Sequence, residues 1–302
     1  MATDIVDRIQ QLKKERNAVI LAHVYQRGEI QDIGDFAGDS LGLSQEAART
    51  DADVIVFAGV HFMAETAAII CPNKRVLIPD VNAGCPMASM VTVRELRERK
   101  EEHPDAAVVC YVNSTAAVKA ESDICCTSAN AVKIVDSIPR DREVIFIPDA
   151  SLGRYVGEQL GREIILWPGY CPTHHRILPE QIEAIKAKHP KALAAVHPEC
   201  IQEVTHIADY VGSTTGILKF CRESDAKEFI IGTEVGVLHP LRQQNPGKTF
   251  YAASPFADCP DMKLCTLEKV LWSLEDMVYE VAVPEDIAAA ARGTIQRMLD
   301  LS

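Results

Sequence analysis

Three Cys-Pro pairs are the strongest chemical signal in this chain of 302 residues. They are Cys85-Pro86, Cys171-Pro172 and Cys259-Pro260, and the cysteines lie 86 and 88 residues apart. None of the three has a second cysteine at CxxC distance, so none forms a local metal-binding loop by itself. Three thiolates brought together would be one ligand short of the four that usually hold an iron–sulfur cluster or a structural zinc ion. A metal site with an open position is the kind that catalyses reactions.

The cysteines belong to a threefold repeat that runs through the chain. In each third, an apolar run ends in two polar residues: His23 and Tyr25, Tyr111 and Asn113, and His197 and Glu199. The first residue of each pair precedes a hydroxyl residue by 17 positions and the cysteine by 60 to 62 positions. The hydroxyl residues are Ser40, Ser128 and Thr214. Agreement at so many offsets indicates three related units.

Apolar, β-rich runs alternate with helical stretches within each unit. In the first unit these runs cover 18–26, 53–59 and 74–80, and the other two units repeat the pattern. The alternation predicts an α/β protein with three αβα sandwich domains, related by a pseudo-threefold axis, and short parallel sheets around a central cluster site. The expected domains are 1–87, 88–173 and 174–265, and a C-terminal helical segment, 266–302, is expected to pack back near the first domain.

Helix signals follow the first two Cys-Pro pairs. Thr92 and Glu95 have the spacing of a capping box. Pro179 stands in the first turn of the next such helix, where proline is tolerated. The predicted helices end near His103 and His189, each of which is followed by a proline.

The composition is that of a globular protein, with 47% apolar and 25% charged residues. A net charge of −12 without a basic stripe argues against a nucleic-acid partner. The apolar stretches are too short to span a bilayer, and the N-terminus lacks the apolar core of a signal peptide. We therefore expect a cytoplasmic protein with reduced cysteines, which favours metal binding or catalysis over disulfides. Five cysteines beside apolar runs are expected in the core: Cys110, Cys125, Cys126, Cys200 and Cys221.

The repeated polar residues are expected to face one cavity, because ligands of open parallel sheets bind outside the carboxyl ends of the strands. Ser40, Ser128 and Thr214 stand where helical segments begin. They either cap these helices or help to bind anions, since a helix N-terminus offers free N–H groups and partial positive charge. Three such sites facing one cavity favour substrates that carry phosphate and carboxylate groups.

His23 and His197 are either satisfied core histidines or groups that transfer protons near neutral pH. Their matched placement, with Tyr25 and Glu199 two residues further on, favours proton transfer.

The three cysteines are either unrelated buried thiols or the ligands of one metal centre. Their shared proline, spacing and position after a strand favour a [4Fe–4S] cluster with one open iron, which can act as a Lewis acid. A structural zinc ion would prefer a fourth protein ligand. His174 lies three residues after Cys171 and is either a metal ligand or a histidine near the site. Asp39 and Glu65 are further candidate acids.

Taken together, these motifs resemble those of the quinolinate synthase (quinolinate synthetase A) family. The matching segments extend over nearly the whole chain in the family's order, and they include GDSLGLSQEA, AGCPMASM, CYVNSTAAVKAESDICCTSAN, WPGYCPTHH, VGSTTG and CPDMKLCTLEKV. The series GDSL, AGCPMA and CPDMK with TLEK is a specific signature.

The resemblance implies three αβα domains around one [4Fe–4S] cluster per chain, with Cys85, Cys171 and Cys259 at the ligand positions. It also implies the reaction: iminoaspartate condenses with dihydroxyacetone phosphate, and phosphate and water leave to give quinolinate. The partners would be these two small molecules, with a possible transient contact to the oxidase or dehydrogenase that produces iminoaspartate.

The family's pocket positions are matched by His23, Tyr25, Ser40, Tyr111, Asn113, Ser128, His174, His197, Glu199, Ser213 and Thr214. By this resemblance the hydroxyls at 40, 128 and 214 would bind anionic groups, and the histidines at 23 and 197 would bind carboxylate. Tyr25, Tyr111 and Glu199 would take part in proton transfers, with Glu199 as the base.

Two positions depart from the family's pattern. The strand-end motif reads HVYQ where HNYQ is common, and we expect Val24 to point away from the cavity. Some members carry CxxCxxC around the last ligand, whereas Cys259 here has no other cysteine before Cys265. Disulfide control at that motif is therefore not expected.

Two other functions fit parts of the pattern. An iron–sulfur hydro-lyase would use the same open iron on a di- or tricarboxylate without phosphate. A non-catalytic cluster or zinc sensor would need four protein ligands and a DNA- or partner-binding surface, and no basic helix-turn-helix is visible.

Overall fold

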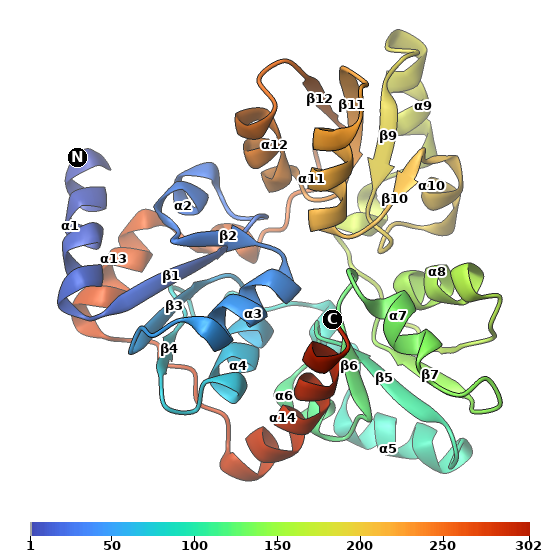
Figure 1. The fold of residues 1–302 in the computed structure, drawn as a ribbon, viewed down its shortest axis with the longest axis horizontal. Helices are drawn as coiled ribbons and strands as arrows, with labels where there is room; N and C mark the ends of the chain where they lie inside the picture. Colours follow the sequence, from blue (N-terminus) through green and yellow to red (C-terminus); the bar gives the residue numbers. More distant parts are fainter. Residues whose placement is uncertain (1) are drawn as a thin grey trace.

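The computed structural model describes residues 2–302 and shows three α/β units placed around a common centre (Figure 1). The first unit is blue, the second green, and the third yellow to orange. Each unit contains one four-stranded sheet, and every strand pair within the sheets is parallel. The predicted α/β class with three sandwich-like units is confirmed.

The elements follow the same order in each unit. The first unit has α1 (Ala2–Glu15), β1 (Ala18–His23), α2 (Gly28–Ile33), β2 (Phe36–Gly38), α3 (Ser40–Arg49), β3 (Val54–Ala58), α4 (His61–Ile70) and β4 (Arg75–Leu77). The second has α5 (Val93–Glu102), β5 (Ala107–Tyr111), α6 (Ala116–Ala120), β6 (Ile124–Cys126), α7 (Ala131–Asp136), β7 (Val144–Ile147), α8 (Ala150–Leu160) and β8 (Ile165–Leu166). The third has α9 (Pro179–Lys188), β9 (Leu193–Val196), α10 (Gln202–Ile207), β10 (Tyr210–Val211), α11 (Thr214–Glu223), β11 (Glu228–Gly232), α12 (Leu238–Gln244) and β12 (Thr249–Ala252).

The sheets repeat one strand order: β2-β1-β3-β4, β6-β5-β7-β8 and β10-β9-β11-β12. The register repeats as well, since the residue before each strand-end polar residue pairs with the last residue of the neighbouring central strand. These pairs are Ala22 with Ala58, Cys110 with Ile147, and Val196 with Gly232. In all three units, the carboxyl ends of the two central strands of the sheet therefore lie side by side at the same edge.

The structure adds one short strand to each unit that the sequence analysis did not predict. These strands are β2, β6 and β10, which have only two or three residues and lie at a sheet edge. Runs of this length carry no periodicity. Each one ends within two or three residues of the hydroxyl residue of its unit, so the edge strand delivers that residue to the centre.

The sheets owe their stability to strands that are buried on both faces. All residues of β3, β5 and β7 are buried, as expected for parallel strands covered by helices. The five cysteines expected in the core are confirmed there, each exposed by no more than 1%.

The predicted helix signals are confirmed. Thr92 and Glu95 form a capping box at the start of α5, and Pro179 is the first residue of α9. His103 and His189 are the C-terminal caps of these two helices.

Two helices follow the third unit. One of them, α13 (Leu267–Asp276), packs against α1 and β3 of the first unit, whereas α14 (Glu285–Asp300) packs against α6 and β6 of the second unit and α4 of the first. Figure 1 shows α14, in red, beside α6 and β6. The buried residues of α14 recur every three or four positions: Ala288, Ala291, Thr294, Ile295 and Met298. This stripe joins the first two units.

We predict that Ile295→Ala lowers the free energy of unfolding by about 2–5 kcal/mol, because truncating this fully buried side chain leaves a cavity. Urea denaturation of the full chain measures the change. Gln296→Ala, on the exposed face of the same helix, is the control and should change stability by less than about 0.5 kcal/mol. Equal effects of the two substitutions would contradict the assigned face.

Candidate active site at the centre of the three units

A cavity of about 140 Å³ lies where the three units meet. Its walls contain all but one of the cluster-ligand and pocket residues expected from the sequence: His23, Tyr25, Ser40, Cys85, Tyr111, Asn113, Ser128, Cys171, His174, His197, Glu199, Thr214 and Cys259. Ser213 does not line the cavity, because its hydroxyl accepts a hydrogen bond from the Gly216 N–H at 3.1 Å and caps α11. The convergence of residues from three units is thus a property of the fold.

The helix-start hydroxyls differ in their placement. Ser40 and Thr214 are the first residues of α3 and α11, and the residues before them, Asp39 and Ser213, provide the caps. The hydroxyl groups of Ser40 and Thr214 therefore do not cap these helices and are free for another role. The expectation that Ser128 begins a helix was wrong, because α7 begins at Ala131 and Ser128 lies in the preceding turn.

Each Cys-Pro pair leads into a single 3-10 turn, namely η1 (Met87–Ser89), η2 (His174–Arg176) and η4 (Met262–Leu264). In all three, the backbone N–H three residues further on, at Ala88, His174 and Met262, lies near the sulfur and lowers the pKa of the thiol. The proline begins the turn, since its fixed φ suits a helical first position. The repeated sequence signal therefore encodes a repeated N–H···S contact.

Burial raises the pKa of all three thiols, that of Cys85 to about 12. A bound metal reverses this preference, because its positive charge stabilises thiolates that are otherwise costly to bury. Three partly buried sulfurs that line one cavity from three units are a donor set that suits an iron–sulfur cluster.

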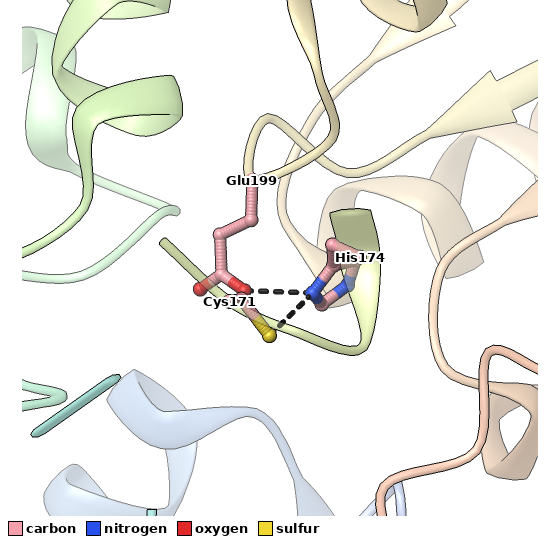
Figure 2. A group of neighbouring side chains, drawn as sticks. All are labelled: Cys171, His174 and Glu199. Atoms are coloured by element: carbon pink, nitrogen blue, oxygen red, sulfur yellow. Dashed lines mark hydrogen bonds and ion pairs between the residues drawn. The ribbon is translucent and has the colours of Figure 1, made fainter. Parts of the chain in front are cut away.

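Cys171, His174 and Glu199 form the tightest group in the cavity (Figure 2). Nδ1 of His174 lies 2.7 Å from Oε2 of Glu199 and 3.2 Å from Sγ of Cys171. The ligand atoms of all three residues lie within 4.8 Å of one another, so the group could hold a metal ion. His174 and Glu199 come from different segments of the third unit and are both nearly inaccessible to solvent.

Glu199 is a buried carboxylate that its neighbours keep ionised. Burial alone would raise its pKa, but the neighbouring His174 and a hydrogen bond from Tyr111 hold the pKa below the usual range. The Tyr111 hydroxyl donates to Oε1 at 2.5 Å. Because Tyr111 belongs to the second unit, this bond also joins two units.

Burial keeps two phenols and two imidazoles of the site in their neutral forms. It raises the pKa of Tyr25 and Tyr111 well above the ordinary phenol value, and the charge on Glu199 raises both further. It lowers the pKa of His23 to about 4 and that of His197 to about 3. Near neutral pH the site therefore holds protonated phenols and neutral imidazoles at these positions.

A second set of hydrogen bonds joins the units around the cavity. The Tyr25 hydroxyl lies 2.8 Å from Oγ1 of Thr214 and 2.7 Å from Oγ1 of Thr233. Nε2 of His174 lies 2.9 Å from the same Thr233 oxygen. His197 Nε2 lies 3.1 Å from the Ser128 hydroxyl of the second unit. Thr233 was not expected from the sequence, although its place in GTE after a strand is the signal that could have found it.

The other candidate acids have different roles. Asp39 lines the cavity but uses Oδ1 to accept a hydrogen bond from the Gly42 N–H at 3.0 Å, which caps α3. Glu65 lies outside the cavity and accepts a hydrogen bond from the Ala116 N–H at 3.1 Å. Val24 is buried away from the cavity, as expected.

One positively charged residue of the cavity wall was not expected from the sequence. Arg176, which follows CPTHH, is the one lysine or arginine among the described residues of the wall. Asn113 was expected, but the structure adds that its Oδ1 is buried without a hydrogen-bond partner in the described chain. Arg176 suits an anionic group of a ligand, whereas the Asn113 oxygen suits a hydrogen-bond donor, since a buried carbonyl oxygen without a partner is costly.

Glu234 and Lys263 form a buried clasp beside the cavity. Glu234 is completely buried; its Oε1 accepts hydrogen bonds from the Cys259 N–H at 3.1 Å and from Lys263 Nζ at 2.9 Å. Lys263 Nζ also donates to the backbone carbonyl of Tyr25. Gly236 permits this contact, because a Cβ there would lie 2.8 Å from that carbonyl. The clasp ties a cysteine of the third unit to the strand end of the first.

The fold and the site together define an α/β enzyme whose single cavity is shared by three repeated units. The chain belongs to the family described as Quinolinate synthetase A protein, whose model matches residues 7–300. It is 56% identical over 296 residues to the quinolinate synthase of Methanosarcina barkeri, covering 98% of this chain and 97% of that protein. It is also 56% identical over 298 residues to the quinolinate synthase of Geobacter metallireducens, covering 99% of this chain and 98% of that protein.

Within residues 2–302, no helix combines the length and the apolar character that crossing a membrane requires.

We predict that Lys263→Met lowers the free energy of unfolding by about 3–5 kcal/mol, because it leaves the Glu234 carboxylate buried without its partner. Adding Glu234→Gln to the same chain should recover most of the loss, and urea denaturation of the two variants measures both effects. The exposed pair Arg94 and Glu98 on α5 is the control: Arg94→Met should cost less than about 1 kcal/mol. If Lys263→Met lowers the free energy of unfolding no more than Arg94→Met does, the clasp does not stabilise the contact between the third unit and the first.

Proposed function

We propose that this chain is a quinolinate synthase of NAD biosynthesis. It would condense iminoaspartate with dihydroxyacetone phosphate to quinolinate and release phosphate and water. The observation that carries the proposal is the single cavity in which three cysteines, one from each unit, face the same buried carboxylate, imidazoles and phenols. The family membership and the relatives' names support the same reaction.

Cys85, Cys171 and Cys259 would hold one [4Fe–4S] cluster. When bound, such a cluster supplies an iron with an open position that acts as a Lewis acid toward a substrate oxygen. The backbone N–H groups that reach the three sulfurs would stabilise the negative charge of the thiolates.

The hydroxyl residues would bind the anionic groups of the substrates, which together bring one phosphate and two carboxylates. Ser40 and Thr214 present their hydroxyls at helix starts, where backbone N–H groups also face an anion. Arg176 adds positive charge at the cavity wall, and the neutral imidazoles of His23 and His197 can donate hydrogen bonds to a carboxylate. The unpartnered Oδ1 of Asn113 would accept a hydrogen bond from a substrate hydroxyl or amine.

Glu199 would be the base. Its carboxylate is ionised and nearly inaccessible to solvent, and it borders the cavity where it would remove a proton from carbon as the ring forms. Tyr111 holds the other carboxylate oxygen and keeps the group in place. Tyr25 and Tyr111 retain their protons and would donate them to leaving oxygens.

We also propose that the enzyme is cytoplasmic and receives iminoaspartate through transient contact with the oxidase or dehydrogenase that produces it. The instability of iminoaspartate in water supports direct delivery.

Analysis of anaerobically purified protein tests the function. We expect about four irons and matching acid-labile sulfide per chain, together with quinolinate and phosphate from the two substrates. A full cluster without phosphate release would instead indicate a hydro-lyase of di- or tricarboxylates. Zinc without sulfide, in a chain that still takes up no iron and sulfide after the zinc is removed by a chelator, would contradict the cluster.

We predict that Glu199→Gln retains the cluster but lowers kcat by about 10²–10⁴-fold, because the amide cannot accept the proton. Iron and sulfide content and initial rates of quinolinate formation measure the two properties. Glu203→Gln, an exposed position on α10 of the same unit, is the matched control and should keep the full rate. Normal turnover in Glu199→Gln would remove this residue as the base.

A further inference from the structure

We propose that Cys171, His174 and Glu199 form a second kind of metal site, which binds one divalent ion of the zinc type when the chain lacks its cluster. An ion bound there would occupy Cys171 and so block cluster assembly. This inference rests on the proposed function only in taking Cys171 as a cluster ligand. The site is argued from the donor atoms, their charge, their outer hydrogen bonds and the open side toward the cavity.

The donor atoms already converge. Nδ1 of His174 faces both Oε2 of Glu199, at 2.7 Å, and Sγ of Cys171, at 3.2 Å (Figure 2). An imidazole nitrogen carries at most one proton, so Nδ1 cannot donate a full hydrogen bond to both neighbours. A divalent ion between the three atoms would satisfy all of them, because sulfur, nitrogen and oxygen are each ordinary zinc ligands. Small side-chain rotations suffice, since the three atoms lie within 4.8 Å of one another.

The charges balance. On binding, Cys171 loses its thiol proton to solvent and becomes a thiolate, while Glu199 is already an anion. One thiolate, one carboxylate and one neutral imidazole cancel the two positive charges of the ion. A buried ion is tolerated only when its charge is compensated in this way.

Every donor also has an outer partner. Nε2 of His174 lies 2.9 Å from Oγ1 of Thr233 and can donate to it once Nδ1 binds metal. The Tyr111 hydroxyl donates a hydrogen bond to the second carboxylate oxygen of Glu199. The backbone N–H of His174 lies near the Cys171 sulfur. Outer hydrogen bonds of this kind orient the ligands of protein metal sites. They are a separate indication of a metal site from the convergence of the donor atoms.

The site has three protein ligands and borders the cavity, so water or a substrate oxygen can take the fourth position. Cys85 and Cys259 line the same cavity but do not belong to this group. The single-ion site and the cluster therefore share only Cys171, which makes them mutually exclusive and separable by mutation.

Metal titration of the full-length, cluster-free chain tests the proposal, with Co²⁺ as the spectroscopic probe and Zn²⁺ as its competitor. We expect one Co²⁺ per chain, with the intense visible bands of a four-coordinate site and a thiolate-to-cobalt charge-transfer band, and complete displacement by one Zn²⁺. Cys171→Ser should abolish the charge-transfer band and weaken binding by more than about 100-fold, since it removes a ligand. Thr233→Val should weaken binding by about 10–100-fold, as loss of an outer hydrogen bond does.

Cys85→Ser and Cys259→Ser are the matched controls, because they remove thiols of the same cavity that lie outside the group. Both should bind Co²⁺ within about threefold of the unaltered chain, although neither should assemble the cluster. Thermal melts followed by circular dichroism confirm that each variant is folded. Equal loss of Co²⁺ binding in Cys85→Ser or Cys259→Ser would show that three thiols bind the ion and would overturn the proposal.

Cluster reconstitution tests the consequence. Chain preloaded with one Zn²⁺ should take up iron and sulfide only after a chelator is added, and uptake at the unhindered rate would overturn the blocking role. Quinolinate formation by the reconstituted chain is measured separately. Failure of the zinc site and failure of the proposed function therefore give different results.

Discussion

The site depends on the burial of polar strand ends by neighbouring units. Each sheet presents imidazole, phenol or carboxylate groups at its carboxyl edge, and residues of a neighbouring unit bind several of these groups. Tyr111 of the second unit satisfies Glu199 of the third, Ser128 of the second meets His197 of the third, and Thr214 of the third meets Tyr25 of the first. Buried polar groups without partners would cost free energy. The three units must therefore close on one another, and the same bonds that close them shape the cavity.

This arrangement also sets the electrostatics. The described cavity wall carries four carboxyl groups, those of Asp39, Glu199, Glu234 and Asp261. The pKa of the Glu199 carboxyl is held below its usual range, whereas the imidazoles of His23 and His197 and the phenols stay neutral because burial penalises charge. Neither these carboxyl groups nor the net charge of −12 would attract anionic substrates. The fixed cation at the wall, Arg176, and the helix starts at Ser40 and Thr214 supply the attraction instead.

Much of the fold and of the cavity wall could be predicted from the sequence, because each unit repeats the same short sequence patterns. Apolar runs predicted the central strands, and matched offsets predicted twelve of the residues that line one cavity. What the sequence could not supply are features too short for periodicity, such as β6 and β10, and partners chosen by tertiary packing. Thr233 pairs with Tyr25 across 208 positions, and Lys263 reaches the carbonyl of Tyr25 across 238. No local pattern encodes such contacts. Ser128 was misplaced because a turn separates it from its helix, whereas its two counterparts begin theirs.

The separation of the site's residues along the chain has a consequence for how the protein folds. Each sheet is built from neighbouring segments and can form early, but the bonds that complete the cavity join residues 69 to 208 positions apart. Contacts of such long range form late, since the entropy of closing the intervening chain must be met first. During synthesis the first unit therefore leaves the ribosome with a polar sheet edge open to water. Its Cys85 emerges before Cys171 and Cys259, the other two cysteines of the cavity. The polarity of these strand ends, which serves binding in the finished protein, also keeps the unfinished edges soluble while the rest of the chain is made.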